Sequence, residues 1–118
     1  MVNGMHLTDI GGGDMLLEPG EGLDPTDPDA YLAPLLHCLQ ERRAQRLFYD
    51  LKELPLIDEP YYDWLLTLHA NCRLIGVELI AVNMQAPAAF ALALQLKALP
   101  PFVCAQDVER ARRRAEVS

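Results

Sequence analysis

The order of apolar segments along this sequence predicts an α/β fold, with a mixed, largely parallel sheet of about four to five strands flanked by about four helices. Short apolar segments alternate with segments whose apolar residues recur every three or four positions, and this alternation is typical of parallel sheets with right-handed crossovers. A run of three glycines between the first two apolar segments predicts a hairpin at one edge of the sheet. The chain has 118 residues, which suffice for one hydrophobic core, so we expect a single domain over residues 1–118.

We expect three successive parts. Residues 1–18 are predicted to form the hairpin, with strands at residues 5–10 and 15–17. Residues 19–29 are an acidic loop rich in proline, glycine and aspartate. Residues 30–118 are predicted to form the α/β core, with strands at residues 46–51, 77–82 and 102–104, and helices at residues 30–45, between Asp58 and Gly76, at residues 87–99 and after Asp107.

Short acidic side chains stand where these helices begin. Asp27 or Asp29 is expected to cap the first helix, since such a side chain can accept a hydrogen bond from a free amide of the first turn. Asp58 or Glu59 is expected to cap the second helix, with Pro60 in its first turn.

The net charge of −7 lies entirely in the first thirty residues, which contain no lysine or arginine. Such a chain is expected to repel nucleic acid, because affinity for phosphates comes from clustered lysine and arginine. The basic run Arg110–Arg114 is interpreted as the last turns of a helix, where cations suit the helix dipole.

We expect a cytoplasmic protein that does not insert into membranes. The longest apolar stretch, Ala86–Leu96, is shorter than the roughly 20 residues needed to span a bilayer, and the N-terminal residues lack the features of a signal peptide. Three cysteines, an odd number, indicate reduced and mostly buried thiols.

Few residues suit catalysis or metal binding. His37 and Cys38 on one predicted helix and His69 and Cys72 on the next could form a zinc site, but the spacing of Cys72 places it on a core-facing stripe, which favours a structural role. No serine nucleophile is available, because Ser118 is the only serine. We therefore expect neither a metal nor a cofactor.

Asp50 ends a buried strand, as the phosphoacceptor of a receiver domain does. The acidic pair and the lysine that a receiver also needs are missing, so we interpret Asp50 as a strand-end side chain that accepts hydrogen bonds from loop amides. Tyr61, Tyr62 and Trp64 lie within four helical positions and cannot all face inward, so at least one is expected on an exposed or partner-binding surface.

Four segments in the middle of the chain, Phe48–Leu51, Leu54–Asp58, Leu74–Ile80 and Asn83–Leu96, together resemble the STAS domain, the fold of bacterial anti-sigma factor antagonists. Phe48–Leu51 is similar to the family's apolar strand that ends in Asp-Leu, and Leu54–Asp58 to its apolar stretch that ends in Ile-Asp. Leu74–Ile80 is similar to the turn from glycine into the next strand. Asn83–Leu96 most resembles the STAS scaffold proteins of the stressosome, with about one residue inserted.

The chain departs from the family at the phosphorylation site. In regulatory members a serine or threonine follows the Ile-Asp pair, whereas here Glu59 and Pro60 follow Asp58, so this loop cannot be phosphorylated at that position. Glu59 would supply one permanent negative charge at a helix N-terminus, where a phosphate would bring about two. The alternative is that Asp58 and Glu59 only cap the helix.

The resemblance implies a non-catalytic regulatory domain that binds other proteins. Its partners would be a serine kinase or anti-sigma factor, or other STAS subunits in a scaffold, and a homodimer is also consistent with it. Charge would give specificity and the tyrosines would give contact area. The expected partner-binding residues are Asp58, Glu59, Pro60, Tyr61, Tyr62 and Asp63.

Three other functions stay open. STAS domains also serve as accessory subunits of membrane transporters, a role that needs no phosphorylation. A small-ligand-binding module is a further alternative, although the sequence has no phosphate-cradling motif. Carboxylates near Asp50 and Asp58 could support acid–base catalysis, but no nucleophile, metal set or cofactor motif accompanies them.

Overall fold

The computed structural model describes residues 2–96 and 99–117. Within them, a mixed sheet has the strand order β1-β2-β3-β4-β5; β1 and β2 are antiparallel and the other neighbours are parallel. The strands are β1 (Met5–Gly11), β2 (Asp14–Pro19), β3 (Arg46–Asp50), β4 (Glu78–Val82) and β5 (Val103–Cys104). The helices are the 3-10 turn η1 (Pro28–Ala30), α1 (Leu32–Glu41), α2 (Glu59–Leu74), α3 (Ala86–Gln95) and α4 (Val108–Val117). The predicted fold class and order of elements are confirmed.

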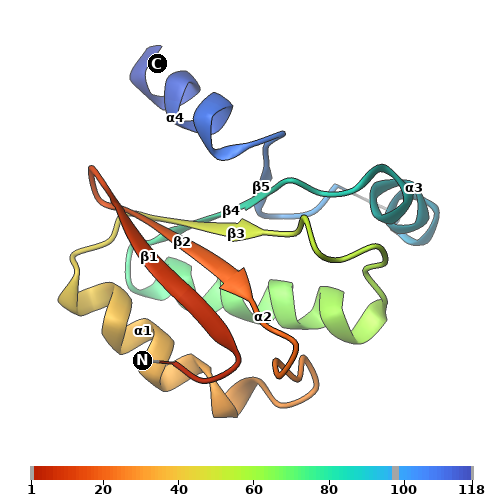
Figure 1. Ribbon diagram of the computed structural model, residues 1–118, viewed down its shortest axis with the longest axis horizontal. Coiled ribbons are helices and arrows are strands. Elements are labelled where there is room, and N and C mark those ends of the chain that lie inside the picture. Colours follow the sequence, from red (N-terminus) through yellow and green to blue (C-terminus); the bar gives the residue numbers. More distant parts are fainter. Residues whose placement is uncertain (1, 97–98, 118) are drawn as a thin grey trace.

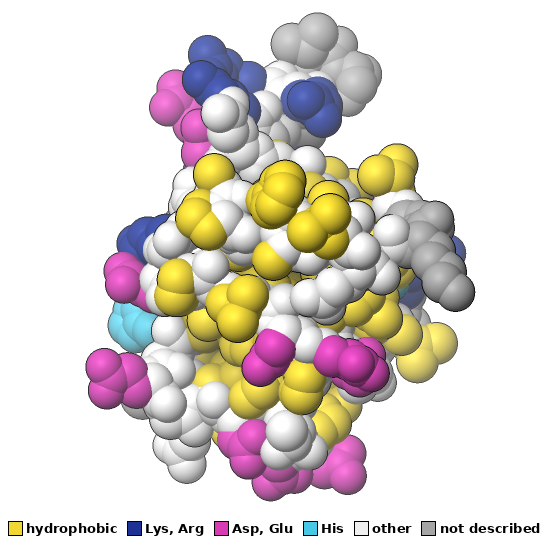
Figure 2. Space-filling view, turned by 90° about the vertical axis from the view of Figure 1, so that its right-hand side faces the viewer, with side chains coloured by type: hydrophobic (Ala, Val, Ile, Leu, Met, Phe, Trp, Pro, Cys, Tyr) yellow, Lys and Arg dark blue, Asp and Glu magenta, His cyan; other side chains and the backbone are white. Residues whose placement is uncertain are grey.

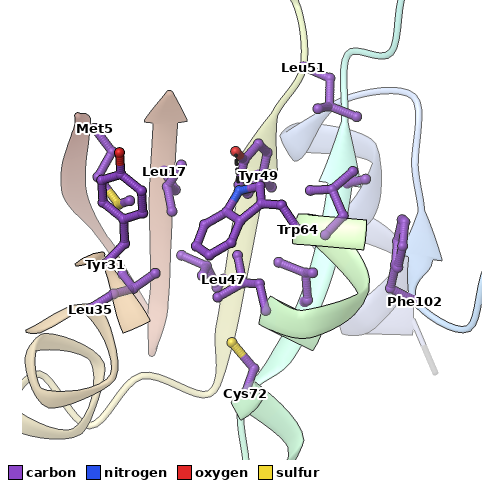
Figure 3. Packing of buried hydrophobic residues seen from close by; sticks show 14 of the residues in the cluster. Met5, Leu17, Tyr31, Leu35, Leu47, Tyr49, Leu51, Trp64, Cys72 and Phe102 are labelled. Carbon is purple, nitrogen blue, oxygen red and sulfur yellow. Dashed lines mark hydrogen bonds between the residues drawn. The ribbon is translucent and has the colours of Figure 1, made fainter. Parts of the chain in front are cut away.

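Helices lie on both sides of the sheet. Figure 1 shows α1 and α2 beneath one face, α3 beside β5, and α4 above the opposite face. Because side chains alternate along a strand, Leu47 and Tyr49 of β3 point toward α1 and α2, and Phe48 points toward α4. The larger core is formed on the α1 and α2 side, where Trp64 packs among leucines (Figure 3). Phe48 forms a smaller cluster with Ile80 and Val82 on the other face.

The hairpin turn depends on glycine. Gly11, Gly12 and Gly13 have φ values of 87°, 66° and 83°, a region that side chains with a Cβ rarely adopt. Asp9 accepts a hydrogen bond from the Gly11 amide at 2.9 Å, and the β1–β2 register shifts between these two residues. The sequence prediction of a glycine turn between two strands is confirmed.

A buried aspartate attaches α4 to the hairpin. The Asp14 side chain is fully buried and forms a two-bond ion pair with Arg46, at 2.7 and 2.8 Å. The second carboxylate oxygen of Asp14 lies 3.1 Å from Nε of Arg112. A terminal nitrogen of the same guanidinium group donates to the backbone carbonyls of Ile10 and Gly11, at 3.2 Å each. The basic run therefore lies on a helix, as predicted, but it starts in the first turn of α4 and only Arg114 lies in the last turn. Arg112 holds that helix against the sheet.

The first helix differs from its prediction. It begins at Leu32 rather than near residue 30 and ends at Glu41 rather than near residue 45, because Arg43 adopts a φ of 53° and turns the chain toward β3. Neither Asp27 nor Asp29 caps it: the N-cap is Tyr31, without a side-chain cap bond. The segment before Tyr31 instead forms its own turn, in which the Tyr31 hydroxyl accepts from the Asp24 amide at 2.7 Å.

Two further expectations need correction. The third helix ends at Gln95 rather than near residue 99, and residues 97–98 of the predicted span lie outside the described residues. The thiols are buried only in part: Cys72 is buried, Cys38 is half-buried and Cys104 is exposed, because the short β5 lies at the edge of the sheet. Burial raises the pKa of the Cys72 thiol to about 12, so it is protonated at neutral pH.

Candidate protein-binding surface

The candidate surface is the start of α2, and Asp58 is its capping residue. The Asp58 backbone is extended, with φ −82° and ψ 177°, and its carboxylate accepts a hydrogen bond from the Tyr61 amide at 3.0 Å. Glu59 is the first helical residue and Pro60 the second, where proline is well tolerated because the amides there have no helical partner. Of the two capping candidates in the sequence, the structure selects Asp58.

Glu59 is left with an uncommitted carboxylate. It is exposed, as is Asp63 one turn later, and among the described residues neither side chain takes part in an ion pair or a side-chain hydrogen bond. Both carboxylates border a shallow groove of about 420 Å³ between the start of α2 and residues 25–28 of the acidic loop. Two like charges four residues apart on a helix repel each other, so an external cation would relieve that repulsion.

Tyr61 is not available to a partner. Only 8% of it is exposed, and its hydroxyl lies 2.6 Å from that of Tyr49, which accepts a second hydrogen bond from Nε1 of Trp64 at 2.9 Å. Burial raises the pKa of Tyr61 to about 12 and that of Tyr49 well above its usual value, so both phenols stay neutral at physiological pH. The expectation that Tyr61 contributes surface contact area is therefore wrong.

Of the three aromatic residues, Tyr62 alone remains partly at the surface. It is half-buried against Phe102, with ring centroids 6.2 Å apart. Trp64 is 1% exposed and makes an edge-to-face contact with Tyr31 at 5.8 Å. The candidate surface thus consists of Asp58, Glu59, Pro60, Asp63 and part of Tyr62.

Asp50 positions the loop that leads to this surface. Its buried carboxylate accepts from the Lys52 amide at 3.0 Å and from Nδ2 of Asn83 at 3.1 Å, and it lies 3.3 Å from the Lys52 ammonium. The predicted role as an acceptor for loop amides is confirmed. No role was predicted for Asn83. Its φ is 60° directly after β4, a conformation that asparagine tolerates better than most residues, so an asparagine at the end of this strand was the signal available in the sequence.

Mutations can separate the capping role of Asp58 from the role of the free Glu59 carboxylate. We expect Asp58→Ala to lower the free energy of unfolding by about 1 kcal/mol, because the Tyr61 amide loses its acceptor. Glu59→Ala is expected to cost less than about 0.5 kcal/mol, through the helix dipole alone. Urea unfolding followed by tryptophan fluorescence measures both values. An equal loss in the two variants would mean that Glu59 also caps the helix.

The histidine and cysteine side chains of the described part of the chain do not form a metal site. Within residues 2–96 and 99–117, no three histidine, cysteine or acidic side chains are placed to hold a metal ion. His37 pairs with Glu41 at 2.8 Å on α1, and His69 packs against Phe102. None of the helices described has both the length and the apolar character that crossing a membrane requires.

Comparison with known proteins assigns the fold. No family model and no curated protein matches the sequence. A serine-to-glutamate variant of Moorella thermoacetica RsbS superposes with a TM-score of 0.77 at 15% identity, covering 94% of this chain and 96% of the other. This chain has the STAS fold. The resemblance found in the sequence is thereby confirmed at the level of the fold.

Two further solved structures have a similar fold. A chain from the structure titled "Molecular architecture of the stressosome, a signal integration and transduction hub" has a TM-score of 0.77 at 14% identity, covering 95% of this chain and 96% of that one. The NMR structure of the protein TM1081 has a TM-score of 0.72 at 14% identity, covering 93% and 87%. The structural similarity therefore extends over almost the whole chain.

Proposed function

We propose that this STAS domain is a non-catalytic regulatory module that binds other proteins through the start of α2. The observation that carries the proposal is the uncommitted carboxylate of Glu59, which is exposed at a helix N-terminus while Asp58 alone provides the cap. In a fold shared with RsbS and a stressosome structure, this free charge suits recognition of a basic patch on a partner.

Glu59 would act as a permanent anion at the family's phosphorylation position. The helix N-terminus carries roughly half a positive charge, so a carboxylate there is stabilised without any modification. A serine-to-glutamate substitution is present in the RsbS neighbour, whereas glutamate is the residue encoded at position 59 here. The domain would then be held in one acidic state instead of switching between two.

The proposed partners are a serine kinase or anti-sigma factor, or other STAS subunits of a scaffold, including a second copy of this chain. The proposed location is the cytoplasm. Electrostatic complementarity at an interface rim mainly sets the association rate and the choice of partner. We therefore expect partner binding to weaken as salt rises, because screening acts on exposed charges such as Glu59 and Asp63.

A tagged pull-down from native lysate, analysed by mass spectrometry, tests this function. Glu59→Lys is expected to reduce recovery of a kinase, anti-sigma factor or STAS subunit at least tenfold. Glu109→Lys is the matched control: it makes the same charge change at an exposed position of α4, across the sheet from α2 (Figure 1). Equal recovery with both variants would show that the start of α2 is not the interface. Recovery of a transporter ATPase instead would favour the accessory-subunit role.

A further inference from the structure

The helix α3 is apolar on the side that faces solvent as well as on the side that faces the core. Its buried residues are Ala88 and Leu92, whereas Phe90 and Leu94 are 69% and 75% exposed. Neither α3 nor its N-cap contains a charged residue. A helix that is apolar all round is normally buried on all sides, so the outer side of α3 is suited to a contact that this chain does not provide.

A groove runs beside this exposed face, between α3 and the β5 region. It has a volume of about 700 Å³, and its walls are almost wholly apolar, with Met84, Leu92 and Leu96 among the lining residues. Its polar side chains are those of Cys104 and Gln106. A groove of this size can receive apolar side chains from a partner, and it offers too few polar groups to orient a polar ligand.

The apolar face lies on the same side of the molecule as the start of α2 (Figure 1). The Gln85 side chain, at the N-terminus of α3, donates to the Lys52 carbonyl at 2.6 Å, and the Leu51 amide donates to the Val82 carbonyl at 2.9 Å. These bonds tie the loop before Asp58 to the start of α3. Figure 2 shows apolar side chains gathered on this side of the molecule with acidic side chains below them.

The acidic side chains beside the apolar face indicate which kind of partner this surface fits. A surface with an apolar centre and an acidic edge complements an amphipathic helix whose apolar stripe is flanked by lysine or arginine. A two-fold contact centred on the acidic edge is a poorer match, because Glu59 and Asp63 would then lie near their own counterparts; a second copy would have to bind here head to tail, through a different surface of its own. We propose that α3 and its groove bind a basic amphipathic helix of the partner, with Glu59 and Asp63 at the edge; this inference rests on the proposed function and names the partner's chemistry.

Synthetic peptides provide the probe. An 18-residue helix of leucine and lysine is expected to bind the wild-type protein, and a peptide with the same leucine stripe but glutamate in place of lysine is not. Phe90→Ser is expected to lower the affinity for the leucine–lysine peptide at least tenfold, as measured by fluorescence anisotropy. Leu74→Ser is the matched control, because Leu74 is 83% exposed at the far end of α2 and loses a similar apolar area.

Three results would overturn the proposal. Phe90→Ser and Leu74→Ser could bind the peptide equally, which would mean attraction by net charge alone. The glutamate peptide could bind as well as the lysine peptide. Sedimentation could show a wild-type dimer that Phe90→Ser dissociates, which would assign the face to a second copy. A fourth result separates this inference from the proposed function: if Glu59→Lys loses the native partner and Phe90→Ser keeps it, binding at the start of α2 stands and this inference fails. If Glu59→Lys keeps the native partner, the proposed function fails.

Discussion

Replacing Asp14 with alanine is expected to lower the free energy of unfolding by about 3–5 kcal/mol, because the change breaks a buried ion pair from one side. The Asp14 carboxylate is fully buried and contacts the guanidinium groups of both Arg46 and Arg112. Without it, the guanidinium groups of two half-buried arginines, whose side chains are 22% and 36% exposed, lose their shared carboxylate and repel each other. A loss of this size is a large part of the free energy of unfolding of a typical domain, which is about 5–15 kcal/mol, so partial unfolding at 37 °C is expected.

Urea unfolding and hydrogen exchange check this result together. The stability loss should appear as a lower urea midpoint, and the α4 amides should exchange faster, since Arg112 no longer has its carboxylate partner. Glu21→Ala is the control: it removes one acidic side chain from an exposed position in the first thirty residues and should change stability by less than about 0.5 kcal/mol. A loss below about 1 kcal/mol for Asp14→Ala would mean that the arginines are solvated in its place.

The fold was predictable because its signals are local. The alternation of strands and helices, the glycine turn and the cap at Asp58 each depend on a few neighbouring residues. The ion-pair cluster around Asp14 was not predictable, because it joins β2, β3 and α4, and the sequence does not show which buried charges meet.

The candidate site was predictable only in part, for a similar reason. The free carboxylate of Glu59 follows from helix position alone, once Asp58 is known to be the cap. The burial of Tyr61 does not, because it depends on the hydroxyl of Tyr49 from another element. The apolar outer face of α3 was also missed, since an alanine- and leucine-rich helix has the same sequence whether one side or all sides are covered.

Asp50→Ala is expected to lower the free energy of unfolding by about 2–3 kcal/mol, because three donors lose one buried acceptor. These donors are the backbone amide and the ammonium group of Lys52 and the side-chain amide of Asn83. The same contacts connect the ends of β3 and β4 and set the path of the loop that reaches Asp58. We therefore expect partner binding to weaken as well, although Asp50 is 4% exposed and cannot touch the partner.

A conservative substitution of Asp50 distinguishes the contribution of its charge from that of its hydrogen bonds. Asp50→Asn keeps one carbonyl acceptor for the Lys52 amide but loses the ion pair with the ammonium group, so both its stability and its partner affinity should lie between those of wild type and Asp50→Ala. The affinity is measured in the pull-down described above, and stability by urea unfolding. If Asp50→Ala loses stability but retains full affinity, the loop holds its shape without Asp50, and the path to Asp58 is set by the Gln85–Lys52 and Leu51–Val82 bonds alone.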